Sequence, residues 1–93
     1  MRDGDIGIKE IKYTEEEIRA RFINEAYSLI ADYEEENPGE SASLEDLTFN
    51  VKVFKNDKDE FIFILNAWYE NWGYGLRIYH QTEDMIRRAE ELF

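Results

Sequence analysis

The stretch Glu60-Phe61-Ile62-Phe63-Ile64-Leu65-Asn66-Ala67-Trp68-Tyr69 decides the fold of this chain of 93 residues. It is apolar on both of the faces that a strand would present, which is typical of the central strand of an antiparallel group. The turn residues Lys55–Asp59 precede it, and residues 47–53 alternate between apolar and polar side chains with the period of a half-buried strand. A third strand is expected over Leu76–His80. The sequence therefore predicts antiparallel strands over residues 47–80.

A long helix is predicted over residues 14–37. Thr14-Glu15-Glu16-Glu17 is a capping box, in which the Thr hydroxyl and the last Glu carboxylate accept free backbone N–H groups of the first turn. Apolar residues then recur at three- and four-residue steps and form one face: Ile18, Phe22, Ala26, Leu29, Ile30 and Tyr33. Asn37-Pro38-Gly39 ends the helix, because Pro disfavours an α conformation at the residue before it. Glu15 with Arg19, and Glu17 with Arg21, are expected to form i,i+4 ion pairs.

Two shorter segments complete the predicted order. Residues 82–93 are predicted to form a C-terminal helix that packs Met85, Ile86, Ala89, Leu92 and Phe93 inward. Residues 1–13 are predicted to be an edge strand or an extended arm, because Gly interrupts their apolar pattern. The chain is therefore expected to be one α+β domain over residues 1–93, of order α-β-β-β-α. Its antiparallel sheet would have three strands, or four with the leading segment, packed by the long N-terminal and the short C-terminal helix.

The composition limits the classes of function. Hydrophobic residues make up 43% and aromatic residues 15% of the chain, which is enough for a core. The chain has no Cys, which excludes disulfides and thiolate metal sites and fits a reducing compartment, so we expect a cytoplasmic location. The longest apolar run, Phe61–Leu65, is too short to cross a bilayer, and the N-terminus has no apolar signal segment. A net charge of −11 disfavours direct binding to nucleic acid or anionic lipid.

No motif in the sequence predicts catalysis or a cofactor. His80 is the only histidine, so a histidine-based metal site has no partners of its own kind. The acidic run that begins at Asp57 resembles a calcium loop, but Ile62 stands where an EF-hand needs Gly. Gly73 and Gly75 do not have the spacing of a phosphate-binding loop. We therefore expect no enzymatic activity, no cofactor and no metal site.

The acidity is concentrated in one part of the chain. From Thr14 to Leu47, eleven carboxylates stand against two arginines, so nine of the eleven net negative charges lie in 34 residues. Carboxylates at the end of the predicted helix oppose the negative end of its macrodipole, and a locally unfavourable choice indicates another use. We therefore predict an acidic patch that binds a partner protein, and the alternative is a solvated helix end that keeps the protein soluble. The patch comprises Asp32, Glu34, Glu35, Glu36 and Glu40.

Aromatic residues are concentrated around a predicted connection over Glu70–Gly75. Exposed Trp and Tyr are the commonest anchors of protein interfaces, so Tyr69, Trp72 and Tyr74 are predicted to bind a partner, with Trp72 expected to be exposed. The alternative is that Trp72 folds back over the sheet edge or a helix end as part of the core. The pattern does not settle whether Trp68 points into the core.

In size, acidity, lack of Cys and predicted order, the chain looks like the small inhibitors that phages encode against host defence nucleases, including some anti-CRISPR proteins. The likeness covers general character and no diagnostic residues, and it implies a protein mimic of nucleic acid whose carboxylates stand where phosphates stand. Acidic immunity proteins that block basic nuclease toxins share this physics. Our hypothesis is a non-enzymatic inhibitor that occupies a basic, nucleic-acid-binding surface of a partner protein. The alternatives are an immunity protein, or a structural or oligomerisation module in which exposed aromatics pair two copies as a homodimer.

Overall fold

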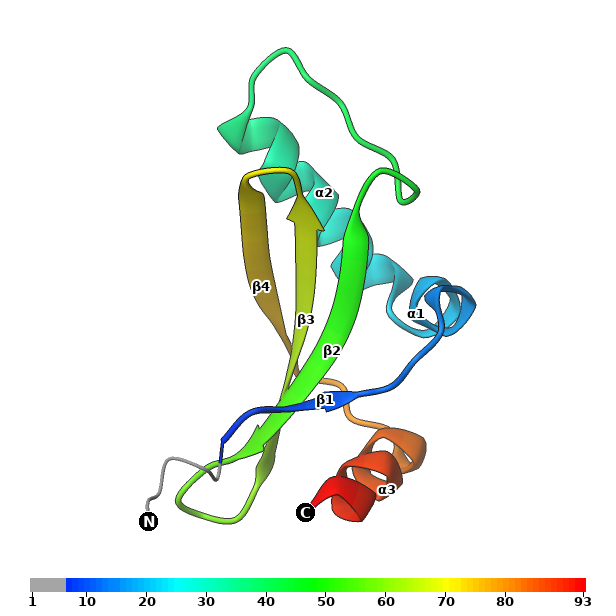
Figure 1. Cartoon of the computed structure of the whole chain (residues 1–93), viewed down its shortest axis with the longest axis vertical. Helices are drawn as coiled ribbons and strands as arrows, with labels where there is room; N and C mark the ends of the chain where they lie inside the picture. Colours follow the sequence, from blue (N-terminus) through cyan, green and yellow to red (C-terminus); the bar gives the residue numbers. More distant parts are fainter. Residues whose placement is uncertain (1–6) are drawn as a thin grey trace.

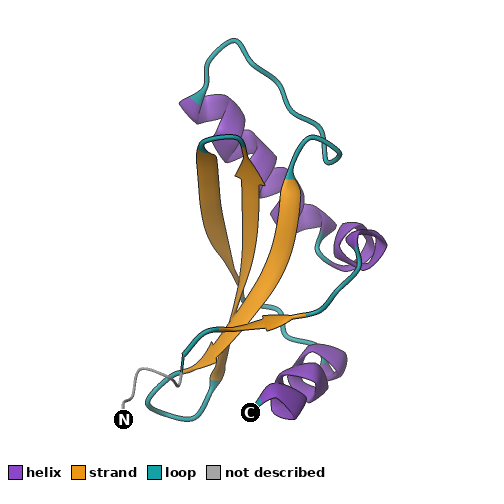
Figure 2. Cartoon of the chain, in the orientation of Figure 1, coloured by secondary structure: helices purple, strands orange, loops and turns teal. Residues whose placement is uncertain are grey.

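The predicted central strand lies in the middle of a four-stranded antiparallel sheet (Figure 1). The structure is a computed structural model, and it describes residues 7–93 of the chain. The elements in chain order are β1 (Lys9–Ile11), α1 (Glu15–Arg21), α2 (Ile23–Glu36), β2 (Thr48–Lys55), β3 (Phe61–Tyr69), β4 (Trp72–Ile78) and α3 (Glu83–Leu92). Within the sheet the strands follow the order β1-β2-β3-β4 (Figure 2). The predicted α+β class is confirmed, and β1 supplies the fourth strand; residues 1–6 of that predicted segment lie outside the described residues.

The strand register sorts the side chains of the sheet into two faces. Val53, Phe63 and Ile78 are cross-strand partners, and each of them is at most 1% exposed. Residues two positions along each strand share this face, because successive side chains of a strand alternate. The intervening residues, such as Ile64 and Trp68, occupy the opposite face and are only partly buried or exposed. β3 is therefore central within the sheet, as predicted, but only its odd-numbered residues lie in the main core.

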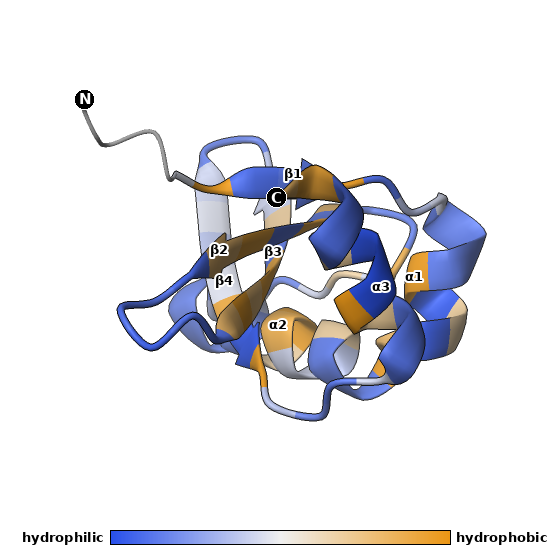
Figure 3. Cartoon of the chain, turned by 90° about the horizontal axis from the view of Figure 1, so that it is seen from below, coloured by the Kyte–Doolittle hydropathy of each residue, from blue (hydrophilic) through white to orange (hydrophobic). Residues whose placement is uncertain are grey.

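All three helices cover the same face of the sheet (Figure 3). Ile18 of α1, Leu29 of α2 and Met85 of α3 belong to one buried cluster with Val53 and Phe63. Every residue in that cluster is within 7% of full burial, so the helices and one sheet face form a single core. No helix within residues 7–93 is long and apolar enough to cross a membrane.

The predicted helix over residues 14–37 is divided into α1 and α2, so the prediction of one continuous helix was wrong. The break lies at Phe22, whose φ of −124° and ψ of 33° are not helical. The Phe22 side chain is 3% exposed and meets the Tyr13 ring edge-on, with 5.5 Å between ring centroids. A bend at this buried anchor allows the two helices to follow a twisted sheet. The predicted start is confirmed, because Thr14 and Glu17 form both hydrogen bonds of the capping box.

Arginines of α3 connect that helix to the start of the chain. Arg88 contacts Glu17 at 2.9 Å and Asp84 at 3.3 Å, donates to the Lys12 carbonyl at 3.2 Å, and stacks over the Tyr13 ring. The predicted Glu15 with Arg19 pair is present at 3.3 Å.

The ion pair predicted between Glu17 and Arg21 is replaced by two contacts to α3. Glu17 pairs with Arg88, and Arg21 pairs with Asp84 at 3.0 Å. The hydrogen bond from the Thr14 N–H, and then the Arg88 guanidinium, lower the pKa of Glu17 below its usual value. Sequence spacing within one helix did not reveal these partners, because they come from the far end of the chain.

The predicted connection over Glu70–Gly75 is shorter than expected. β4 begins at Trp72, so only Glu70 and Asn71 form the hairpin turn, and Glu70 adopts a φ of 52°. The glycines that suggested a loop lie inside β4, opposite larger side chains of β3. A Cβ atom at Gly73 would lie 3.2 Å from Cδ1 of Trp68. These glycines therefore make room for neighbouring side chains, which is a second reason for glycine in a strand.

Candidate interaction surface

Two carboxylates of the predicted acidic patch hold the loop that follows α2. Glu34 accepts a hydrogen bond from the Ala42 N–H at 3.2 Å, and Glu40 accepts one from the Tyr33 hydroxyl at 2.8 Å. The hydrogen bond to Glu40 raises the pKa of Tyr33 to about 12, because the neutral phenol is the form that donates it. These hydrogen bonds give both acids a structural role in holding the loop.

The other three carboxylates of the patch remain available. Asp32 is half-buried, whereas Glu35 and Glu36 are exposed. Within residues 7–93, none of the three makes an ion pair or a side-chain hydrogen bond to another residue. α2 has no basic residue in its last turn, so its C-terminal charge is not compensated locally. These carboxylates can therefore act on a partner without first breaking a contact within the chain.

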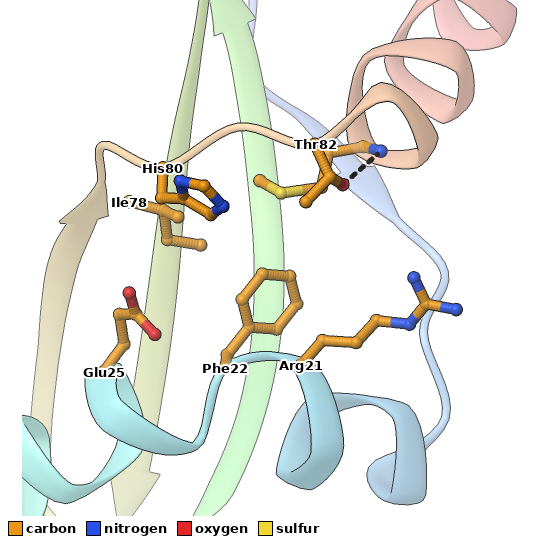
Figure 4. Close-up of a pocket in the computed structure, with 7 residues that line it drawn as sticks. Arg21, Phe22, Glu25, Ile78, His80 and Thr82 are labelled. Carbon is orange, nitrogen blue, oxygen red and sulfur yellow. Dashed lines mark hydrogen bonds between the residues drawn. The ribbon is translucent and has the colours of Figure 1, made fainter.

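Asp32 and Glu36 lie on the flank of α2 that faces β4, and Glu35 lies next to them on the side of the helix away from the core. Glu25 is seven residues before Asp32 and so lies on the same side of the helix. The Glu25 side chain lines a cavity together with Ile78 and His80, at the end of β4 (Figure 4). Glu34, on the other flank, contacts the loop that leads to β2. We name Glu25, Asp32, Glu35 and Glu36 the acidic flank; Glu25 was missed from the sequence, although its helical spacing could have indicated it.

The predicted aromatic anchors lie beside α2, and their burial corrects one prediction. Tyr33 of α2 meets Tyr69 and Trp72 edge-on, with ring centroids 5.6 Å and 5.3 Å apart. Trp72 is half-buried against the core, and its indole nitrogen is buried without a hydrogen-bond partner in the described residues. The expectation that Trp72 is exposed was therefore wrong, because the register places it on the face that the helices cover.

Tyr74 is the anchor that remains accessible. Its side chain is 49% exposed, and its ring lies next to Trp72, with 6.1 Å between centroids. Because Tyr33 joins α2 to Trp72, Tyr74 and the acidic flank lie on one side of the molecule. β4 is the last strand of the sheet, and it runs along this side with one edge that no strand within residues 7–93 pairs (Figure 1). Charge and an exposed aromatic therefore converge, a relation that the sequence alone left open.

The cavities of the described residues are small or shallow. The cavity beside His80 has a volume of about 60 Å³ and is lined by Arg21, Phe22, Glu25, Ile78, His80, Thr82 and Met85 (Figure 4). Pockets that enclose small-molecule ligands usually have volumes of about 300–1,000 Å³. A larger hollow of about 330 Å³, near Arg77 and Ile86, is open to solvent. No group of three His, Asp or Glu residues gathers as a metal site among residues 7–93.

The chain matches no protein-family model, no curated protein sequence and no solved structure. The likeness to phage-encoded inhibitors is thus one of size, charge and element order. Any function must be inferred from the surfaces themselves, of which the acidic flank with Tyr74 combines the most features of a protein interface.

Proposed function

We propose that the chain is a non-enzymatic binding protein that occupies a basic, nucleic-acid-binding surface of a partner protein and thereby inhibits it. One observation carries the proposal: carboxylates without partners in the described chain lie beside an exposed tyrosine at the edge of the sheet. The lack of Cys fits a cytoplasmic partner. An immunity protein against a basic nuclease toxin is one form of this function, and the identity of the partner distinguishes it.

The acidic flank carries a row of negative charges along α2, as a nucleic-acid strand does along its axis. Glu25 and Glu36 are eleven residues apart in one helix, which corresponds to about 16 Å along the axis, so the four carboxylates of the flank are on average about 5.5 Å apart. A single strand of duplex DNA carries one charge per about 3.4 Å of axis. Basic side chains arranged for phosphates would therefore meet a row of negative charge on α2 that is less dense than that of DNA.

The two parts of the surface have different roles in this proposal. The acidic flank attracts a basic partner over a distance and raises the association rate, an effect that salt weakens. Tyr74 offers a large ring that loses water on contact, as aromatic anchors do at interface centres. Because Tyr74 belongs to β4, the strand beside which α2 packs, a bound partner would contact both.

The test compares three forms of the tagged protein in a pull-down from source lysate. The flank variant carries Asp32→Asn, Glu35→Gln and Glu36→Gln, and it leaves Glu34 and Glu40 intact because they hold the loop. A control variant removes the same charge at exposed acids elsewhere: Glu45, Glu90 and Glu91. We expect the parent and the control, but not the flank variant, to capture one basic nucleic-acid-binding protein.

The captured protein is then purified and tested for nucleic-acid binding with increasing amounts of the chain. Displacement of the nucleic acid, weakened by moderate salt, supports the proposal. Capture that survives in the flank variant, or an affinity that does not change with ionic strength, contradicts it.

A further inference from the structure

The face of the sheet opposite the helices is uncovered and carries apolar side chains. Trp68 is 38% exposed there, and Tyr79, which follows β4 on the same face, is 76% exposed. Ile64 of β3 and Phe54 of β2 lie on the same face and are partly buried. We call this surface, centred on Trp68 and Ile64, the outer face.

The glycines of β4 make the outer face flat. Gly73 and Gly75 present no side chain, and neighbouring groups of β3 occupy the space above them. A Cβ atom at Gly73 would lie 3.2 Å from Cδ1 of Trp68, and one at Gly75 would lie 2.8 Å from Oδ1 of Asn66 and 3.0 Å from Cγ2 of Ile64. Side chains of β3 therefore lie across the edge strand and form a low surface that suits packing against another sheet. This surface is apolar at Trp68 and Ile64, and between them Asn66 donates a hydrogen bond to Asn50 at 3.2 Å.

The charge of the outer face differs from that of the rest of the chain. Its charged side chains in the strand register are Glu10, Lys52 and Arg77, which sum to +1, whereas the whole chain carries −11. The Arg77 guanidinium lies over the Tyr79 ring at 4.7 Å. A basic partner is not attracted to this surface. A second acidic chain can approach it, provided that its own acidic elements stay distant.

We propose that two copies of the chain pack face to face through the outer face. In this arrangement the helices lie on the far side of each sheet, so the two acidic flanks point away from each other. Pairing through the free edge of β4 would instead bring both acidic flanks together, which their mutual repulsion disfavours. Charge therefore selects the outer face over the sheet edge as the contact between copies.

The size of the outer face sets the strength of the contact. β2, β3 and β4 contain 8, 9 and 7 residues, so at about 3.4 Å per residue and about 4.8 Å per strand they present about 400 Å². Two such faces give about 800 Å² in total, which is below the roughly 1,000 Å² that stable specific interfaces exceed. The dimer is therefore expected to be weak and to form only at high protein concentration. Each dimer would expose two acidic flanks on opposite sides and so could bind two partners, although self-association stands whether or not the proposed function is correct.

The first experiment is sedimentation equilibrium of the full chain from low micromolar to near-millimolar concentration. We expect a reversible dimer whose affinity rises with salt, because salt screens the repulsion between two chains of charge −11. The affinity for a basic partner is instead expected to fall as salt rises, so the two proposals can fail separately. A chain that stays monomeric at the highest concentration and high salt overturns the inference.

Variants then locate the contact. Trp68→Thr is expected to raise the dissociation constant more than about tenfold, as loss of a central aromatic anchor does. Lys52→Glu provides a second test that leaves the apolar residues in place, and it is also expected to weaken the dimer. Tyr74→Thr is the matched control, because Tyr74 is a similarly exposed aromatic on the helix side, and its dimer should persist. Equal dissociation of Trp68→Thr and Tyr74→Thr would place the contact elsewhere and refute the proposal.

Discussion

Substitutions at Trp72 can test whether this tryptophan, which the sequence predicted as a binding anchor, is instead part of the core. The structure places its ring against Tyr33, half-buried beneath α2, with the indole nitrogen buried and unpaired in the described residues. Two substitutions separate these features. Trp72→Ala removes the whole ring, whereas Trp72→Phe keeps an aromatic ring at the site and removes the polar N–H group.

The expected effects follow from the burial of the ring. Replacing a buried Trp by Ala costs about 3–5 kcal/mol, and partial exposure of Trp72 places its cost near about 3 kcal/mol, including the loss of the edge-on contact with Tyr33. Trp72→Phe loses about 40 Å² of apolar contact, or about 1 kcal/mol. It also removes an unsatisfied buried donor, which costs about 1–3 kcal/mol when present. The Phe variant should therefore be as stable as the parent or up to about 2 kcal/mol more stable.

Urea denaturation followed by far-UV circular dichroism measures both changes, with the m-value checked for constancy. Trp68→Ala is the control, because the Trp68 ring lies on the uncovered face and is 38% exposed, so its removal should cost less than that of Trp72. All variants are compared at low protein concentration, so that association does not contribute. A cost for Trp72→Ala no larger than that for Trp68→Ala would refute the assignment of Trp72 to the core. A loss of more than about 2 kcal/mol in the Phe variant would show that the indole N–H is satisfied.

Three further predictions concern contacts that hold the fold together. Arg88→Met should lower the melting temperature by about 5 °C, because the substitution removes contacts to Glu17 of α1 and to the Lys12 carbonyl before that helix. In the same thermal scan, Arg87→Met should change the melting temperature little, because Arg87 makes a single exposed ion pair within residues 7–93. Glu40→Gln should bring the pKa of Tyr33 down from about 12 toward its usual value, measured as phenolate absorbance during alkaline titration. Because folding raises this pKa, the stability that it contributes is complete below pH 10 and is lost as the pH rises towards 12, so alkaline unfolding should come at lower pH in the variant. Gly39→Ala should cost about 1–2 kcal/mol in urea denaturation, because Gly39 has a φ of +90°, which a residue with a Cβ rarely adopts. An added Cβ would meet no atom within 4 Å, so the cost would come from the backbone conformation alone, and an unchanged midpoint would contradict this origin.

Local patterns predicted the elements whose physical causes are local. The capping box at Thr14 and the apolar run of β3 depend on neighbouring residues in the chain, and both were read correctly. The break at Phe22 was not predicted, because the helical periodicity of apolar residues continues across it. The break coincides with tertiary contacts, because Phe22 is buried in the core and meets the Tyr13 ring. The start of β4 was missed because glycines in a loop and glycines beneath a cross-strand Trp give the same sequence signal.

The candidate site was predicted in part for the same reason. Charge can be counted from the sequence, and four of the five acids of the predicted patch lie on α2, whereas Glu40 lies in the loop after it. The distinction between carboxylates that hold a loop, such as Glu34, and those that remain free, such as Glu36, depends on hydrogen bonds across the loop. The faces of Trp68 and Trp72 depend on strand register, and a two-residue turn between their strands fixes opposite directions for these two rings.

The acidic flank should reduce the stability of the free chain if binding is its purpose. Asp32, Glu35 and Glu36 stand in the last two turns of α2, where each carboxylate opposes the helix macrodipole at a cost of about 0.3–1 kcal/mol at low salt. They have no compensating partner among residues 7–93. The variant that neutralises these three side chains should therefore be about 1–2 kcal/mol more stable than the parent. The control at Glu45, Glu90 and Glu91 should gain less stability, because only Glu90 and Glu91 stand near the end of a helix, α3. A gain in stability together with a loss of partner binding would mean that the flank is kept for its partner. A flank variant that is less stable than the parent would mean that these carboxylates hold the fold, and the binding role would have to move to Tyr74 and the edge of β4.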